Sequence, residues 1–196
     1  MTQPSSPSAQ APLIALVRHG ETDWNLAQRI QGRTEVELNS TGRAQAAATA
    51  SALQETGGWN EVIASPLGRA IETAQILASG IGLPAPAIDE QLWERDFGPA
   101  EGLLITEVNE RWPGLDIPGA ESRSAVASRS AGALTRILAA SPGAIVVAHG
   151  AMLREGLSLL TGTAMPRILN GEVWLLWASS DGFTTERMQS ELSVRA

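Results

Sequence analysis

The 196-residue chain is 43% hydrophobic, with a mean hydropathy of −0.01 and a net charge of −7. Its length suits one domain with a substantial core. Its acidity argues against nucleic acid or an anionic membrane as partner, and no apolar run approaches the roughly 20 residues of a membrane helix. Because it has no cysteine, disulfides, thiol nucleophiles and cysteine-based metal sites are excluded.

The first residues, 1–12, are rich in Ser, Pro, Gln and Ala and lack both the basic and the apolar stretch of a signal peptide. We predict a disordered lead-in over residues 1–12 and a single domain over residues 13–196. The cytoplasm is the expected location.

The first half of the domain begins with an apolar run, 13–17, of the kind that forms a strand buried on both faces. Residues 21–37 lack periodicity and indicate a long ordered loop. Asn39 or Ser40 is expected to cap a helix over about 41–55. A short strand over 61–64 then ends at Ser65 and Pro66, which predict a helix with Ser65 as its cap, running to about residue 79.

The second half continues with a short strand at 87–89 and helices at about 103–111 and from residue 122 to 138. The apolar run 144–148 predicts a second buried strand, followed by a helix over about 151–160. Residues 172–177 and 183–188 predict two strands around a tight turn.

The two histidines of the chain share one context, since His19 and His149 each follow an apolar run and each precede a glycine. In open α/β sheets, ligands bind outside the carboxyl ends of the strands, so adjacent strands would bring the two imidazoles face to face. Arg69 follows another strand at the start of a helix, a position that favours anions. Taken singly, each histidine could be structural and Arg69 a solvated helix residue. Together they indicate an anion-binding site.

Five blocks occur in order over about residues 13–177. They are Arg18-His19-Gly20-Glu21-Thr22 with Trp24-Asn25, Ser65-Pro66-Leu67-Gly68-Arg69-Ala70, Leu92-x-Glu94-x-x-Phe97-Gly98-x-x-Glu101-Gly102, Gly119-Ala120-Glu121-Ser122 with Arg129, and Val146-Val147-Ala148-His149-Gly150. This series resembles the histidine phosphatase superfamily, the phosphoglycerate-mutase-like group. The resemblance implies an α/β fold, a three-layer α/β/α sandwich with a mostly parallel central sheet.

The resemblance also implies residue roles, with His19 as the nucleophile that takes the phosphoryl group and Glu94 as the proton donor. The residues implied to bind substrate are Arg18, Asn25, Gln31, Gly32, Arg69, His149 and Gly150. Nearby arginines disfavour imidazolium, so we expect His19 to be neutral. Considered without the resemblance, Glu94 would first be taken as a solvated loop carboxylate.

The function predicted is hydrolysis of small phosphate monoesters through phosphohistidine. No metal and no cofactor are expected, since no Asp, Glu and His cluster has metal-ligand spacing. One alternative is a cofactor-dependent phosphoglycerate mutase. It is less favoured because mutases of the family carry a long basic insertion, whereas residues 102–118 contain one basic residue, Arg111. A second alternative is a non-catalytic phosphate-binding domain.

The rim of the site is predicted to include Phe97, Trp112, Met152 and Arg154. This rim would be more apolar than cationic, which favours a sugar, nucleoside or metabolite phosphate over a polyanion. The oligomeric state is left open.

Overall fold

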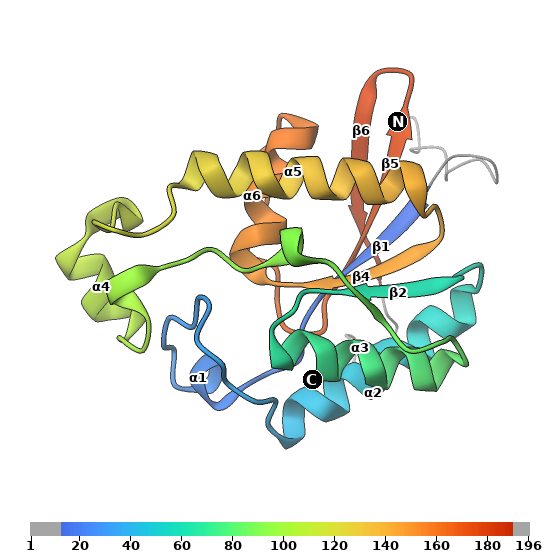
Figure 1. Ribbon diagram of the computed structural model, residues 1–196, viewed down its shortest axis with the longest axis horizontal. Helices are drawn as coiled ribbons and strands as arrows, with labels where there is room; N and C mark the ends of the chain where they lie inside the picture. The colour runs from blue at the N-terminus through green and yellow to red at the C-terminus, as the bar shows by residue number, and fades with distance from the viewer. Residues whose placement is uncertain (1–12, 190–196) are drawn as a thin grey trace.

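The computed structural model describes residues 13–189, so the predicted lead-in over residues 1–12 lies outside the described residues. The described strands form one six-stranded sheet in the order β3-β2-β4-β1-β5-β6 (Figure 1). They are β1 (Leu13–Arg18), β2 (Glu61–Ala64), β3 (Ala87–Ile88), β4 (Ala144–Ala148), β5 (Val173–Ser179) and β6 (Gly182–Arg187). The first four run parallel, and β5 and β6 are antiparallel to their neighbours. The mostly parallel sheet is therefore confirmed, whereas the extent of the single domain over 13–196 stays a prediction.

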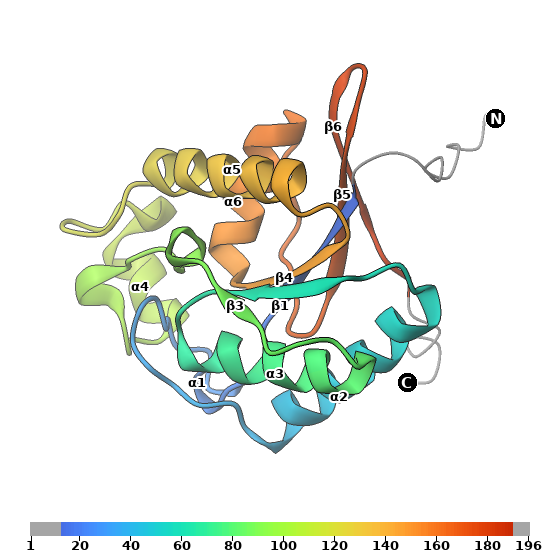
Figure 2. The same cartoon turned by 45° about the vertical axis from the view of Figure 1, so that its right-hand side comes forward.

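Helices cover both faces of this sheet. They are α1 (Asp23–Leu26), α2 (Ser40–Thr56), α3 (Gly68–Ile81), α4 (Ile105–Arg111), α5 (Arg123–Ala140) and α6 (Gly150–Thr161), with 3₁₀ turns at Glu90–Leu92, Gly98–Ala100 and Pro113–Leu115. Helices α2 and α3 lie on one face and α5 and α6 on the other, while the β5–β6 hairpin extends past them (Figure 2). This is the three-layer sandwich that the sequence predicts.

The layers follow from the alternation of side chains along β1. Ile14 and Leu16 pack into the apolar cluster that contains α5 and α6 residues. Ala15 and Val17 point to the opposite face, into the cluster with α2 and α3. All four are fully buried, which is why the strand has no polar residue before its end.

Two local predictions are wrong. Ser65 does not cap a helix, because its hydroxyl lies 2.7 Å from His149 Nε2. Helix α3 begins later, at Gly68, and the Glu35 carboxylate accepts the Gly68 N–H at 3.0 Å. The second error is the long loop over 21–37, which contains the one-turn helix α1. A capping box between Thr22 and Asn25 forms that turn, and a single turn is too short to produce periodicity.

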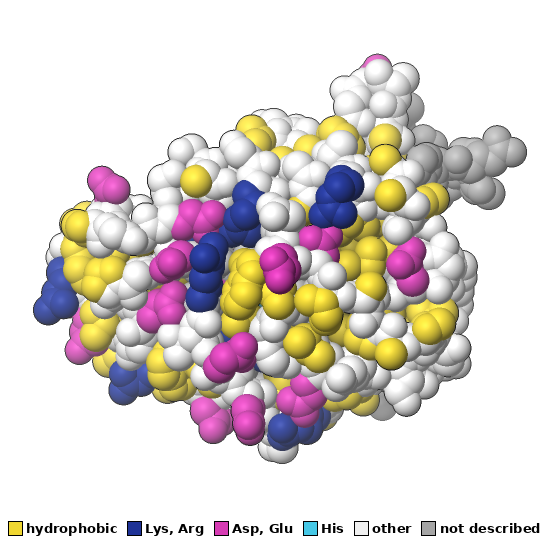
Figure 3. All heavy atoms as spheres, in the orientation of Figure 1, with side chains coloured by type: hydrophobic (Ala, Val, Ile, Leu, Met, Phe, Trp, Pro, Cys, Tyr) yellow, Lys and Arg dark blue, Asp and Glu magenta, His cyan; other side chains and the backbone are white. Residues whose placement is uncertain are grey.

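Charged side chains of both signs lie interspersed on the face drawn in Figure 3, with no continuous basic patch there. None of the helices within residues 13–189 is long and apolar enough to cross a membrane.

Candidate active site

The two histidines meet at the carboxyl ends of β1 and β4. These strands are parallel neighbours whose register pairs Arg18 with Ala148, so the next residue of each strand is a histidine. The two ring centroids are 5.2 Å apart, and the His19 N–H donates to the Ala148 carbonyl at 3.0 Å. The pairing of two buried strands therefore brings together residues that are 130 positions apart in the sequence.

His19 is neutral at neutral pH, and its ring lone pair lies on Nε2. Its Nδ1 lies 2.8 Å from the Gly20 carbonyl oxygen, which can only accept, so Nδ1 carries the ring proton. Burial, and after it the charges of Arg69 and Arg18, lower the pKa of His19 well below 6.5. The expected neutral state thus has two causes, of which burial is the larger.

Gly20, the residue after His19, allows the backbone of helix α2 to pack closely against it. A β-carbon on Gly20 would lie 2.3 Å from the carbonyl oxygen of Gly42, in the first turn of α2. Only glycine lets these two backbone segments come so close. Helix α2 is therefore docked directly against the residue that follows His19.

Arg69 is 1% exposed and projects from the first turn of α3 toward His19. Its Nε donates to His19 Nε2 at 3.2 Å, and its two terminal nitrogens donate to the carbonyls of Thr34 and Gly32 at 2.9 and 2.7 Å. Burial lowers the pKa of Arg69 below its ordinary value. Three of its five N–H groups are used, so the guanidinium is held in place with two donors left for an anion.

Arg18 lies at the end of β1. Its Nη1 donates to the Ile168 carbonyl at 2.8 Å, while its buried Nε has no partner among the described residues. Burial lowers the pKa of Arg18 to about 10, so this guanidinium keeps its charge at neutral pH. Gly150 passes close by, since a β-carbon there would lie 3.3 Å from Arg18 Nε. The unpaired Nε is a donor available to a bound phosphate.

Glu94 joins the site from the segment after β3, and its carboxylate lies at the start of α6. Oε1 accepts the N–H groups of Arg95 and Met152 at 2.8 and 2.9 Å, and Oε2 accepts that of Ala151 at 3.1 Å. The side chain is 8% exposed. Glu94 is therefore a buried side chain held by three hydrogen bonds, and not the solvated loop carboxylate expected without the family resemblance.

The loop after α1 supplies the remaining residues of this side. Gly32 has a φ of +57°, and a β-carbon on it would overlap the Glu101 carboxylate. That carboxylate accepts the N–H groups of Arg33 and Thr34 at 2.9 Å each and that of Phe97 at 3.2 Å. Glu101 thus holds the loop whose carbonyls bind Arg69.

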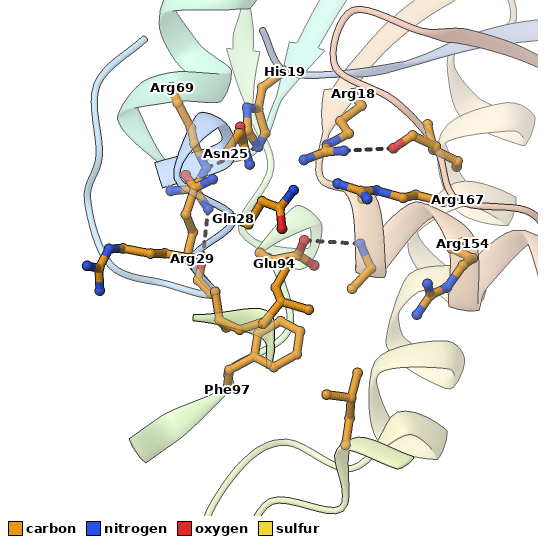
Figure 4. A pocket seen from close by; sticks show the side chains of 18 of the residues that line it. Arg18, His19, Asn25, Gln28, Arg29, Arg69, Glu94, Phe97, Arg154 and Arg167 are labelled. Atoms are coloured by element: carbon orange, nitrogen blue, oxygen red, sulfur yellow. Dashed lines mark hydrogen bonds between the residues drawn. The ribbon is translucent and has the colours of Figure 1, made fainter. Parts of the chain in front are cut away.

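The pocket formed by these residues has a volume of about 280 Å³ (Figure 4). The predicted site residues that line it are Arg18, His19, Asn25, Gln31, Gly32, Arg69, Glu94 and Gly150. His149 is the exception. It is fully buried behind His19, and its Nδ1 has no partner among the described residues.

Comparison with known proteins identifies the family. The sequence profile of the histidine phosphatase superfamily (branch 1) matches residues 14–189. The chain belongs to the histidine phosphatase superfamily.

Relatives of this chain include an uncharacterized phosphatase of Bacillus subtilis, 38% identical over 76% of this chain and 77% of the relative. A metal-independent phosphoserine phosphatase of Arabidopsis thaliana is 38% identical over 82% of this chain and 74% of its own length. The structure of a mycobacterial glucosyl-3-phosphoglycerate phosphatase with VO3 superposes with a TM-score of 0.80 at 26% identity, covering 92% and 99% of the two chains. Proteins named as phosphoglycerate mutases are also among the relatives.

The rim of the pocket differs from the prediction. Phe97 and Arg154 line the pocket, but Trp112 does not, and Met152 is fully buried in the core. The rim does contain apolar side chains, such as Phe97, Ile105 and Leu115, but the pocket carries more positive charge than predicted. Five arginines line it, and Glu94 is its only acidic lining residue among those described. The arginines are Arg18, Arg29, Arg69, Arg154 and Arg167.

Sequence reasoning also missed Asn170 and Arg167, in the segment between α6 and β5. Asn170 Nδ2 lies 3.0 Å from the His19 carbonyl and 3.0 Å from Asn25 Oδ1, so it ties β1 to the loop of α1. Neither residue belongs to a periodic element or a motif, and no sequence signal distinguishes them. Within residues 13–189, no group of three or more His, Asp or Glu side chains could hold a metal ion.

Proposed function

We propose that this histidine phosphatase is a metal-independent hydrolase of small phosphate monoesters that works through a phosphohistidine on His19. The observation that carries the proposal is the neutral His19, whose Nε2 lone pair lies beside the guanidinium of Arg69, with Arg18 on the same pocket. A phosphate monoester is a dianion, and these are the groups that would bind it next to a nucleophile.

In the first step, His19 Nε2 attacks phosphorus. The N–P bond forms as the bond from phosphorus to the ester oxygen breaks, and Glu94 gives its proton to the leaving alkoxide. The arginines hold the phosphoryl oxygens in line and offset their charge, which is most of what phosphoryl transfer requires.

In the second step, water attacks the phosphohistidine. Glu94, now a carboxylate, takes one proton of that water as the new P–O bond forms, and the N–P bond breaks to return neutral His19 and inorganic phosphate. Both steps use the same acid–base group, and the covalent intermediate divides one difficult displacement into two easier ones.

The test is phosphate release from a panel of monoesters ranked by kcat/KM, including 3-phosphoglycerate and fructose 2,6-bisphosphate. His19→Ala should abolish release. Glu94→Gln should reduce it about 100-fold or more for alkyl phosphates, and less for p-nitrophenyl phosphate, whose leaving group needs no proton. Glu90→Gln, an exposed carboxylate in the same segment, is the matched control. Unchanged release by His19→Ala would refute the proposal.

The alternative function, a phosphoglycerate mutase, can be tested by a direct assay. The short segment 102–118 favours hydrolysis, but the structure removes part of that argument because Arg154 and Arg167 bring positive charge to the pocket from elsewhere. Incubation of 3-phosphoglycerate with 2,3-bisphosphoglycerate separates the two, since a mutase forms 2-phosphoglycerate faster than it releases phosphate. The non-catalytic alternative predicts phosphate binding with no turnover, and retention of both His19 and Glu94 in the pocket argues against it.

A further inference from the structure

Three arginines of the pocket have no part in the proposed chemistry, namely Arg29, Arg154 and Arg167. Arg29 donates from Nη1 to the Gly102 carbonyl at 2.6 Å, which leaves Arg154 and Arg167 to be explained. Arg154 comes from the second turn of α6 and Arg167 from the segment that connects α6 to β5. With Arg18 they form one side of the pocket, and the Glu94 carboxylate lies between this side and the side of His19 and Arg69 (Figure 4). In the proposed chemistry Arg18 and Arg69 bind the phosphoryl oxygens, and Arg154 and Arg167 have no assigned ligand.

Arg167 has no carboxylate within ion-pair distance and makes no hydrogen bond among the described residues, while every ion pair found there involves other arginines. It lies near enough to Arg18 that its charge contributes to lowering the pKa of Arg18. The two guanidinium groups therefore repel each other, and an anion bound between or beside them would offset this repulsion.

Arg154 is only partly neutralised. Its terminal nitrogen lies 3.1 Å from Glu155 Oε1, but the same oxygen also accepts from Arg123 at 3.0 Å. One carboxylate therefore serves two guanidinium groups.

The backbone on either side of the exposed Arg167 is anchored to the phosphate-binding pair. The next residue, Ile168, accepts the hydrogen bond of Arg18, and Asn170 binds the His19 carbonyl. Anchors on both the nucleophile and Arg18 hold this segment at the pocket wall.

Apolar side chains line the rest of the pocket, among them Phe97, Ile105 and Leu115. A ligand that matches these features has a phosphate at one end, a short carbon skeleton, and a second anion. We propose that Arg154 and Arg167 bind a second anionic group of the same substrate, a carboxylate or a further phosphate. This inference rests on the proposed function, because it concerns the same pocket.

The experiment compares substrate pairs that differ only in the second charge. The ratio of kcat/KM for 3-phosphoglycerate over glycerol 3-phosphate tests a carboxylate, and the ratio for fructose 1,6-bisphosphate over fructose 6-phosphate tests a second phosphate. At least one ratio should exceed about tenfold in the unmodified protein, the size expected of a charge-assisted contact. Arg167→Gln should lower that ratio about tenfold, and Arg167→Lys should restore part of it.

The matched control is Arg43→Gln, which removes an exposed arginine of α2 that pairs with Glu72 and does not line the pocket. It should leave both ratios unchanged. The same pairs are also measured by calorimetric binding to His19→Ala with and without Arg167→Gln, where no turnover is needed.

The outcomes separate the two proposals. If the unmodified protein releases no phosphate, the proposed function fails, and the binding ratios still decide the subsite. If it hydrolyses both members of each pair equally well, or if Arg167→Gln leaves the preferred ratio unchanged, the subsite is refuted while the hydrolase stands.

Discussion

Acidification should destabilise this protein through its two buried histidines. His19 is 3% exposed and His149 is fully buried, and burial, followed by the positive charge of Arg69, lowers the pKa of each well below 6.5. In the unfolded chain both rings titrate near 6.5. Below that pH the unfolded state binds two protons that the folded state does not, so the free energy of unfolding falls as the pH falls. Above pH 6.5 neither state binds these protons, and the histidines no longer make stability depend on pH.

The magnitude follows from the same two groups. Each histidine changes the free energy of unfolding by about 1.4 kcal/mol per pH unit once the pH is below 6.5. From pH 7.5 to pH 5.5 the two together should cost about 3 kcal/mol. Carboxylates contribute little in this range, because their ordinary pKa values lie lower.

Urea denaturation at both pH values measures this loss, with the m-value checked for constancy. His149→Gln should halve the difference between the two pH values, whatever it does to stability at either one, and the double variant with His19→Gln should nearly remove it. A loss of the same size in the double variant, or no loss in the unmodified protein, would refute the reasoning.

Three further predictions concern packing, binding and metal. Gly20→Ala should destabilise the fold by about 2 kcal/mol or more, since its β-carbon would overlap the Gly42 carbonyl, whereas Gly132→Ala in α5 meets no neighbour and should be neutral or stabilising in the same urea assay. Arg69→Lys should lower kcat/KM about 100-fold, because an ammonium cannot bind the Gly32 and Thr34 carbonyls and a phosphate at once; steady-state kinetics measure it. Treatment with EDTA should leave phosphate release unchanged, and a strict dependence on added Mg²⁺ or Zn²⁺ would contradict the proposed mechanism.

The sheet and the meeting of the histidines could be predicted because local and global signals agree. The apolar runs 13–17 and 144–148 are typical of strands covered on both faces, and such strands place the residues at their carboxyl ends along one edge. His19 and His149 are the first polar residues beyond that edge, apart from Arg18. Pairing of neighbouring strands then determines their separation.

The capping of α3 could not be predicted from its own segment. Ser65 followed by Pro66 is a typical helix start, yet the hydroxyl is used by His149, 84 residues away, and the helix N-terminus is served by Glu35. Tertiary contacts overrode a local preference there. The serine is placed to orient an imidazole of the site, which explains why the local signal fails at this position.

The charge of the pocket wall was misjudged for a similar reason. Arg167 lies in an irregular segment with neither periodicity nor motif, and its location depends on the hydrogen bonds that Ile168 and Asn170 make with β1 and the residue after it. Arg154 and Phe97 were correctly expected at the rim, whereas Trp112 and Met152 were not found there. Nothing in the sequence near these four residues indicates which of them line the pocket. The arrangement of irregular segments is decided by contacts that the sequence does not display locally.

The phosphoryl-enzyme intermediate is the most direct test of the account. The protein is mixed with a good substrate, quenched in alkali, where phosphohistidine survives, and the peptide that contains His19 is weighed by mass spectrometry. We predict one added phosphoryl group on His19 and none in His19→Ala. Glu94→Gln should show a larger fraction of phosphorylated protein, because it lacks the base that activates the attacking water. Phosphate release at an undiminished rate with no phosphoryl group ever found on His19 would contradict the central claim.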